Sequence, residues 1–323
     1  MTRPESTGAI SVAGLTKSYG NHTVLDGLDL FVPEGGVFAL LGANGAGKTT
    51  TVRILSTLMP FDSGTVSVAG HDLPRSAQEV RRSISVTGQY AAVDKLLTAR
   101  ENLALMGELH HLGRRESRRR AAELLDRFSL SDAADRRSET YSGGMRRRLD
   151  LAMSLVANPK VVFLDEPTTG LDPRSRRDMW IVIRELVASG VTIFLTTQYL
   201  DEADELADRI AVIDGGRIVA EGTADELKRL VHGGHMELQL TDPAQLDRAA
   251  GALPGSVTRP ETLTVEVPTD GSIASLRALL DRIDDDISVE KFALHTPDLD
   301  DVFFALTGSP RDADTPTTKA AAR

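Results

Sequence analysis

Hydrophobic residues in the first two thirds of the chain form short continuous runs, separated by longer patterns with helical spacing. Because a continuous apolar run of four or five residues is typical of a strand covered on both faces, these runs predict buried strands of a parallel sheet. Their alternation with helical patterns predicts an α/β layered domain between about residues 10 and 224. The sequence after the last run, Asp214-Gly215-Gly216-Arg217, predicts a hairpin turn. The four runs are residues 37–41, 161–164, 191–195 and 210–213.

The pattern changes after about Glu226. Hydrophobic and polar residues alternate over 236–240 and 263–267, as in strands with one buried face. Hydrophobic residues from Ile273 to Ile283 have the spacing of one helical face, and residues 287–294 predict a further strand. In the first part of the chain, Val52, Leu55 and Leu58 have the same helical spacing. We therefore expect two domains, over residues 8–228 and 235–308, with the second of α+β type. The polar stretch 309–323 is expected to be a flexible tail.

Composition narrows the possible classes of protein. The 323 residues are 41% hydrophobic and 26% charged, which is enough for a full core and excludes wholesale disorder. The net charge of −10 argues against nucleic acid as a general partner. The absence of cysteine excludes disulfides, thiolate metal sites and a cysteine nucleophile. Since the chain has neither a signal-peptide pattern nor an apolar run approaching 18 residues, we expect a cytosolic protein.

A phosphate-binding loop follows the first buried strand. Residues 42–49 read Gly-Ala-Asn-Gly-Ala-Gly-Lys-Thr, and a helical pattern comes next. Glycines let backbone N–H groups converge on phosphate oxygens, and the helix N-terminus adds favourable partial charge. Lys48 is expected to reach the β- and γ-phosphates, and the Thr49 hydroxyl to bind Mg²⁺. The loop therefore predicts ATP and Mg²⁺ as ligands.

A pair of carboxylates, Asp165 and Glu166, ends the second buried strand. Ligands collect at the carboxyl edge of an open α/β sheet, so this pair is expected near the phosphate loop. Asp165 is placed to hold Mg²⁺ and Glu166 to orient the attacking water. A third motif, Ser142-Gly143-Gly144, stands at the start of a helical pattern and offers another anion site. Two phosphate sites in one chain suggest that the second serves a nucleotide held by another protomer.

In order and content these motifs resemble the ATP-binding cassette of ABC transporters, over about residues 8–225. The resemblance implies a P-loop NTPase cassette over 8–228, with a mixed-sheet core and a helical subdomain at about 90–160, followed by the small α+β domain. It implies that Glu166, Gln89 and Gln198 act in catalysis and that Thr49, Gln89 and Asp165 hold Mg²⁺. It further implies that Tyr19 stacks on adenine. The nucleotide-binding residues implied are Tyr19, Gly42, Asn44, Gly45, Ala46, Gly47, Lys48, Thr49, Thr50, Ser142, Gly143, Gly144 and Asp172.

The same resemblance implies partners. In a head-to-tail homodimer, Ser142 and Gly144 of one protomer would meet ATP held by Lys48 of the other. The segment from Gln89 to Leu97 would contact an integral membrane permease, which would hold the chain at the cytoplasmic face of the plasma membrane. No nucleic acid partner is expected.

One position departs from the family pattern. Gln198 stands where the family usually has a switch histidine, and an amide can donate a hydrogen bond but cannot carry charge. This glutamine and the C-terminal residues 299–308 are similar to the ATP-binding subunits of daunorubicin/doxorubicin-resistance exporters. That similarity implies export of a drug or natural product, and hence antibiotic resistance.

Two alternatives remain at this point. Gln198 leaves open a regulatory cassette subunit with little ATP turnover, although an intact Glu166 argues for hydrolysis. A non-transport cassette ATPase, acting on ribosomes or DNA, is the other. The single phosphate loop, the lack of cysteine and the acidic charge argue against it.

Overall fold

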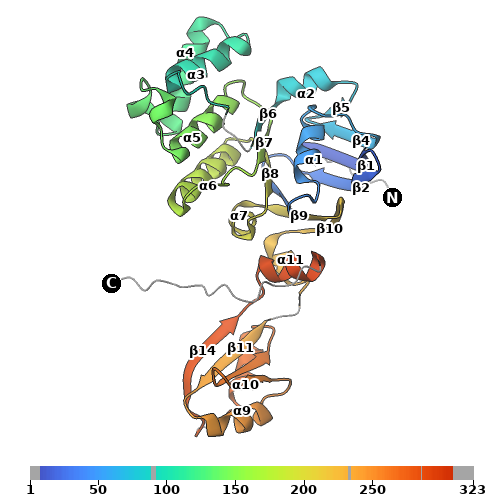
Figure 1. Ribbon diagram of the computed structural model, residues 1–323, viewed down its shortest axis with the longest axis vertical. Helices are drawn as coiled ribbons and strands as arrows, with labels where there is room; N and C mark the ends of the chain where they lie inside the picture. The colour runs from blue at the N-terminus through green and yellow to red at the C-terminus, as the bar shows by residue number, and fades with distance from the viewer. Residues whose placement is uncertain (1–7, 89–91, 232–233, 285, 308–323) are drawn as a thin grey trace. The chain divides into compact units, whose positions relative to one another are not determined.

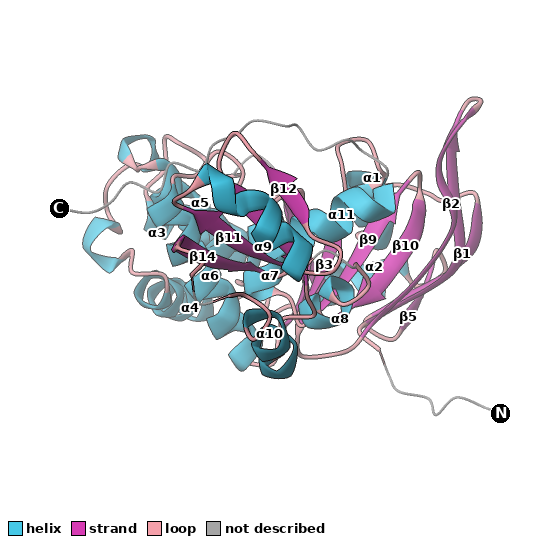
Figure 2. Cartoon of the chain, turned by 90° about the horizontal axis from the view of Figure 1, so that it is seen from below, coloured by secondary structure: helices cyan, strands magenta, loops and turns pink. Residues whose placement is uncertain are grey.

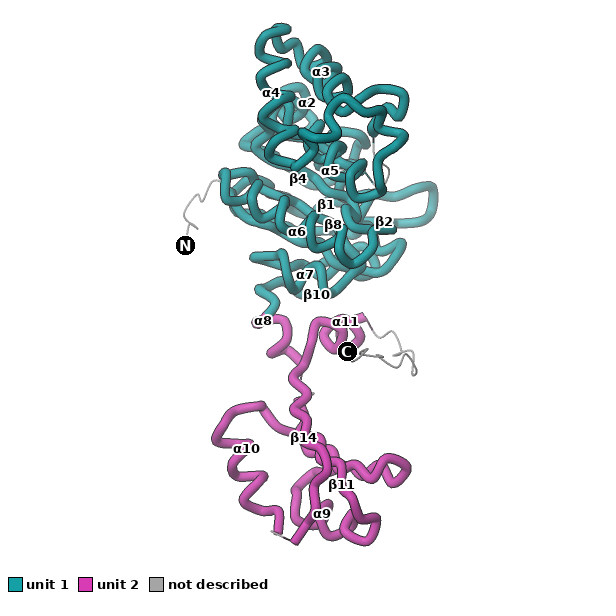
Figure 3. The backbone as a smooth tube through the Cα atoms, turned by 90° about the vertical axis from the view of Figure 1, so that its left-hand side faces the viewer, with its two compact units in different colours: residues 1–224 teal, residues 225–323 magenta. Residues whose placement is uncertain are grey.

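The computed structural model describes residues 8–88, 92–231, 234–284 and 286–307. The chain forms two compact units, residues 1–224 and 225–323 (Figure 3). No helix among these described ranges is long and apolar enough to cross a membrane. Gln89 and the expected tail over 309–323 lie outside the described residues.

The first unit begins with an antiparallel sheet in the order β2-β1-β4-β5. Alternate residues of the long first strand, such as Ile10 and Val12, are buried, because only one face of this sheet packs on the core. Its strands are β1 (Ile10–Tyr19), β2 (His22–Val32), β4 (Ser63–Val68) and β5 (His71–Leu73).

A six-stranded mixed sheet forms the centre of the unit, in the order β10-β9-β3-β8-β7-β6. All but β10 run parallel, and every residue of β3, β7 and β8 is buried. Phe194 of β8 lies between Phe38 and Phe163, with ring centroids 5.8 and 5.6 Å away. The predicted buried strands are confirmed, as is the hairpin turn at Gly215 and Gly216. The six strands are β3 (Val37–Leu41), β6 (Ile84–Thr87), β7 (Val161–Asp165), β8 (Thr192–Thr197), β9 (Arg209–Asp214) and β10 (Arg217–Gly222).

Helices flank these sheets, and three of them gather in a separate group (Figure 1). Those near the sheets are α1 (Lys48–Leu55), α2 (Ala77–Ser83), α6 (Pro173–Ala188) and α7 (Leu200–Leu206). The group consists of α3 (Ala99–Leu109), α4 (Arg114–Arg127) and α5 (Gly143–Ser154), with 3-10 turns at Ser131–Ala133 and Ser138–Thr140. A capping box between Thr98 and Glu101 starts α3.

One helical prediction in this unit is wrong at its end. Helix α1 stops at Leu55, and Leu58 is 68% exposed rather than on the buried face. Thr57 adopts a left-handed φ of 66°, and the Leu58 N–H donates to the Arg53 carbonyl at 2.8 Å. This backward bond closes the helix before the apolar face can continue.

The second unit is a small α+β fold, whose helices and strands are coloured separately in Figure 2. Its antiparallel sheet has the order β12-β13-β11-β14. Met236, Leu238 and Leu240 of β11 are buried with Val265 and Val267 of β13, as their alternation predicted. The strands are β11 (His235–Leu240), β12 (Val257–Arg259), β13 (Thr264–Pro268) and β14 (Val289–His295). The helices are α8 (Ala224–Lys228), α9 (Leu246–Ala252), α10 (Ile273–Leu280) and α11 (Leu299–Thr307), with a 3-10 turn at Pro243–Gln245.

The predicted helical face from Ile273 to Ile283 is only partly correct. Helix α10 ends at Leu280, no residue of it is fully buried, and Ile273 is 79% exposed. Leu276, Leu279 and Ile283 pack against the core of the unit while remaining partly accessible. Because α9 and the sheet already enclose the core, α10 covers its margin only. Leu263, expected in a strand, precedes β13 with a φ of 53°.

Candidate active site

The phosphate loop runs from the end of β3 to the start of α1, as predicted. Gly47 has a φ of 115°, and a β-carbon there would lie 2.7 Å from Leu25 Cδ2. A β-carbon on Gly42 would lie 2.6 Å from the Ile213 carbonyl oxygen. Because β2 and β9 press on the loop at these points, only glycine fits without strain. Residues 43–45 at the tip are exposed, Ala46 is buried, and Thr49 and Thr50 start the helix half-buried.

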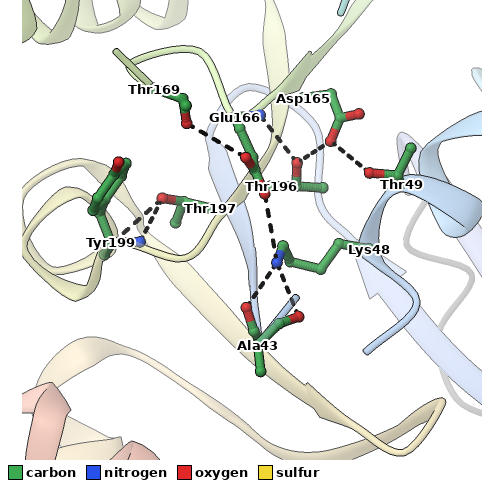
Figure 4. Close-up of polar contacts among 10 residues, drawn as sticks. Ala43, Lys48, Thr49, Asp165, Glu166, Thr169, Thr196, Thr197 and Tyr199 are labelled. Carbon is green, nitrogen blue, oxygen red and sulfur yellow. Dashed lines mark hydrogen bonds and ion pairs between the residues drawn. The ribbon is translucent and has the colours of Figure 1, made fainter. Parts of the chain in front are cut away.

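Lys48 is the buried centre of the site, with 4% of the residue exposed. Its Nζ donates to the carbonyl oxygens of Gly42 at 2.7 Å and Ala43 at 3.1 Å, and lies 3.6 Å from Glu166 Oε1 (Figure 4). Burial lowers the pKa of Lys48, while Glu166 and Asp165 oppose that shift by their negative charge. The ammonium is thus held within the loop, where it can exchange carbonyl partners for phosphate oxygens.

Asp165 and Glu166 are presented by the end of β7, and both are buried. Thr196 of the adjacent strand β8 donates to Asp165 Oδ1 at 2.6 Å, and its hydroxyl accepts from the Glu166 N–H at 3.2 Å (Figure 4). Glu166 has a left-handed φ of 49°, a conformation that costs a non-glycine residue free energy. Its N–H also donates to the Thr196 carbonyl at 3.1 Å, which holds this turn in place.

Thr196 is a site residue to which the sequence motifs assigned no role. The only signal was its position two residues before Gln198, at the end of a buried strand. The motif does not show that β8 lies beside β7, where the Thr196 hydroxyl donates to the Asp165 carboxylate and accepts from the Glu166 N–H.

The arrangement suits a magnesium ion bound together with nucleotide. The Thr49 hydroxyl donates to Asp165 Oδ1 at 3.3 Å, so two hard oxygen ligands from different elements converge beside the phosphate loop. Among the described residues no group of three or more His, Cys, Asp or Glu side chains is arranged to hold a metal ion. Magnesium does not require one, because substrate phosphates and water supply most of its ligands.

Tyr19 lies at the end of β1 and is 47% exposed. Its hydroxyl donates to Met59 Sδ at 2.8 Å, and Lys17 Nζ lies 5.8 Å from its ring centroid. The ring is therefore fixed at its tip while part of its surface is available for stacking on a base.

Gln198 directly follows β8, the strand between β3 and β7. The glutamine is therefore at the same carboxyl edge as the phosphate loop and the two carboxylates. The Thr197 hydroxyl accepts from the Tyr199 N–H at 2.9 Å, which shapes the turn around it.

Ser142 and Asp172 line a second hollow on the same unit, of about 310 Å³. Ser142 caps α5 by accepting from the Met145 N–H at 3.2 Å, and Asp172 caps α6 by accepting from the Ser175 N–H at 2.9 Å. A β-carbon on Gly144 would lie 2.7 Å from Ser175 Oγ, so any other residue there would have to displace the Ser175 side chain on α6. Gly143 faces open space. The hydrogen bonds that Ser175 donates to Asp172 lower the pKa of this carboxyl group, so it stays charged.

Comparison with known proteins agrees with this geometry. The model of the family described as "ABC transporter" matches residues 25–169. The daunorubicin/doxorubicin resistance ATP-binding protein DrrA of Streptomyces peucetius is 50% identical over 95% of each chain. The doxorubicin resistance ATP-binding protein DrrA of Mycobacterium tuberculosis is 45% identical over 98% of each chain. The chain belongs to the ATP-binding proteins of the ABC transporter family.

The fold agrees as well. A solved nucleotide-free ATP-binding cassette of an ABC transporter superposes with a TM-score of 0.63 at 27% identity, over 69% of this chain and 94% of that one. The predicted family and fold class are therefore confirmed. As a member of this family the chain binds nucleotide, and the family hydrolyses ATP to power transport. ATP-binding subunits of ABC transporters generally pair with membrane permease components.

Proposed function

We propose that this ABC ATP-binding subunit is the motor of an exporter that removes a drug or natural product through a separate permease. The observation that carries the motor role is the meeting of Lys48 and Glu166 at 3.6 Å in a buried position beside Asp165. The cargo class is supported by the relatives named for daunorubicin and doxorubicin resistance, since the similarity extends through the second unit.

In this proposal each side chain acts on nucleotide or water. Lys48 and the loop N–H groups bind the β- and γ-phosphates, and Tyr19 stacks on the base. Glu166 accepts a hydrogen bond from the attacking water and orients it toward the γ-phosphate. Thr49, Asp165 and Gln89 would hold Mg²⁺, which neutralises phosphate charge when bound. Gln198 donates its amide hydrogen bond toward the γ-phosphate.

The second hollow completes the site of another protomer. Ser142 caps the N-terminus of α5, and the free N–H groups at a helix N-terminus favour an anion such as a phosphate. We infer a head-to-tail homodimer in which ATP held by Lys48 of one protomer meets Ser142 and Gly144 of the other. The dimer would be held at the cytoplasmic face of the plasma membrane by the permease.

A regulatory subunit with little turnover is not favoured. Glu166 stands on the nucleotide-facing edge with its backbone fixed by two hydrogen bonds from its N–H to Thr196. A subunit that only binds nucleotide would not need an acid held in this strained turn.

The test uses inside-out vesicles that contain the chain together with a candidate permease, which is a membrane protein with several hydrophobic spans of about 20 residues. Mg²⁺-ATP turnover and ATP-driven uptake of doxorubicin are measured for the unmodified chain, Glu166→Gln, and Glu116→Gln as a control on the exposed surface of α4. We expect turnover and uptake for the first and third, and neither for Glu166→Gln. Turnover without uptake would refute doxorubicin as a cargo and leave the motor role standing. Absence of turnover in the unmodified complex would refute the motor role.

A further inference from the structure

Helix α5 contains a buried ion pair. Arg147 and Asp150 lie one turn apart, with 7% and 5% of each residue exposed, and Arg147 Nη1 is 3.3 Å from Asp150 Oδ2. The other helical ion pairs of the three-helix group, such as Glu116 with Arg119, lie on its surface. No motif assigned Arg147 or Asp150 a role.

The pair makes hydrogen bonds to backbone groups of two other segments, the one after β6 and the one after β7. Arg147 Nε donates to the Pro167 carbonyl at 2.8 Å, and its Nη1 donates to the Gly88 carbonyl at 2.7 Å. Asp150 Oδ1 accepts from the Ala92 N–H at 2.8 Å. Pro167 directly follows Glu166, and Gly88 follows the end of β6. A planar guanidinium can bridge carbonyls in such fixed directions, whereas an ammonium cannot reach both.

Folding stability by itself does not explain this buried ion pair, because burying two charges costs free energy. Burial lowers the pKa of Arg147 and raises the pKa of Asp150, because each charge has been removed from water. Well-packed apolar side chains of similar volume often replace a buried ion pair without loss of stability. Arg147 Nη2, moreover, is buried without a hydrogen-bond partner among the described residues. The pair is therefore better explained by the backbone groups that it positions than by a contribution to stability.

The Arg147–Asp150 pair lies between two functional residues, Ser142 at the start of α5 and Glu166 beside Pro167. Ser142 caps the same continuous helix of 12 residues, five residues before Arg147. A displacement of the Ser142 end would therefore reach Pro167 through the hydrogen bond of Arg147, and so the backbone of Glu166. In the proposed dimer these ends serve different nucleotides, because Ser142 faces ATP of the other protomer while Glu166 acts on its own.

We propose that Arg147 and Asp150 are positioning residues that couple the two nucleotide sites of the dimer within each protomer. The inference rests on the proposed head-to-tail motor. Closure of one site on Ser142 moves α5, and Arg147 then sets the carbonyl of Pro167 and the adjoining Glu166 for hydrolysis at the other site. The chemical step itself is left to Glu166.

The experiment measures ATP turnover against ATP concentration for the chain in complex with its permease. The variants are Arg147→Lys, which retains the charge but loses the fork, and the double variant Arg147→Met/Asp150→Leu, which removes both charges. We expect a Hill coefficient above 1 in the unmodified complex that falls to about 1 in both variants. Because misplacing a catalytic group by about 1 Å can cost about 10²-fold, we expect kcat to fall by up to about 10²-fold. The Kd for a fluorescent ATP analogue, measured on the subunit alone, should stay within about twofold, because the phosphate loop is untouched.

The matched control is Glu116→Gln, which breaks an exposed pair of the same spacing on α4. It should change neither kcat nor the Hill coefficient. A double variant that is as stable as the unmodified chain yet uncoupled separates positioning from a structural role. The proposal is overturned if the unmodified complex hydrolyses ATP with a Hill coefficient of 1, or if the variants lose thermal stability while their cooperativity is retained. Lack of turnover in the unmodified complex refutes the motor itself, and this is seen before any variant is compared.

Discussion

Thr196→Val tests whether the hydroxyl beside the two carboxylates holds the site together. Valine preserves the shape of the side chain but removes the 2.6 Å hydrogen bond to Asp165. A hydrogen bond to a charged group contributes about 1.5–3 kcal/mol. The Glu166 N–H retains the Thr196 carbonyl at 3.1 Å, and Asp165 retains the Thr49 hydroxyl at 3.3 Å, so no further group is left unpaired. We therefore expect a loss of about 2 kcal/mol in the free energy of unfolding.

Urea unfolding followed by tryptophan fluorescence measures this loss. Trp180, the single tryptophan, lies on α6, so its signal reports on the first unit. For a unit of this size a loss of about 2 kcal/mol corresponds to a fall in Tm of about 4–8 °C. ATP turnover should also fall, since Asp165 is less firmly oriented toward the nucleotide.

Thr192→Val on the same strand provides the control. The Thr192 hydroxyl accepts from the Gly35 N–H at 2.9 Å, a bond between neutral groups at the opposite end of β8. Its removal should cost only about 1 kcal/mol and leave turnover unchanged. If Thr196→Val costs no more than Thr192→Val, the hydroxyl does not support the charge of Asp165 and the reasoning is refuted.

Three further substitutions probe other parts of the chain. Gly47→Ala should abolish binding of a fluorescent ATP analogue, because the new β-carbon meets Leu25 at 2.7 Å with φ at 115°; near-normal affinity would contradict the packing. Glu202 is fully buried, and this burial raises its pKa, so the folded chain binds a proton that the unfolded chain releases as pH rises. Stability should therefore fall as the pH rises above the ordinary pKa range of a glutamate, and Glu202→Gln, which retains the acceptor for Trp180, should lessen that fall in urea midpoints. Met236→Ala should cost the second unit about 2–5 kcal/mol by calorimetry, since Met236 is fully buried; a cost below 1 kcal/mol would show that the site collapses around the cavity.

Much of the first unit could be predicted because its signals are local. Strands β3 and β7 are buried on both faces, so each is a continuous hydrophobic run that can be recognised in the sequence. The second unit was harder. Its strand β11 alternates strictly and was predicted, whereas α10 has a helical apolar face that lies only at the margin of the core. Periodicity indicates which face is apolar, but it does not measure how much of that face another element covers.

The chemical groups of the site can be identified from the amino-acid sequence alone. Each motif is a run of consecutive residues, and a run such as 42–49 already contains the glycines, the ammonium and the hydroxyl that a phosphate requires. Which of these groups contact one another depends on the three-dimensional packing of the strands and helices. Lys48 reaches Glu166 and Thr196 reaches Asp165 because β8 lies between β3 and β7, and Arg147 reaches Pro167 because α5 packs against β6, the neighbour of β7. A buried polar group needs a hydrogen-bond partner from a neighbouring element. In this sheet the neighbours are set by the strand order β10-β9-β3-β8-β7-β6, which differs from the order of the strands in the sequence.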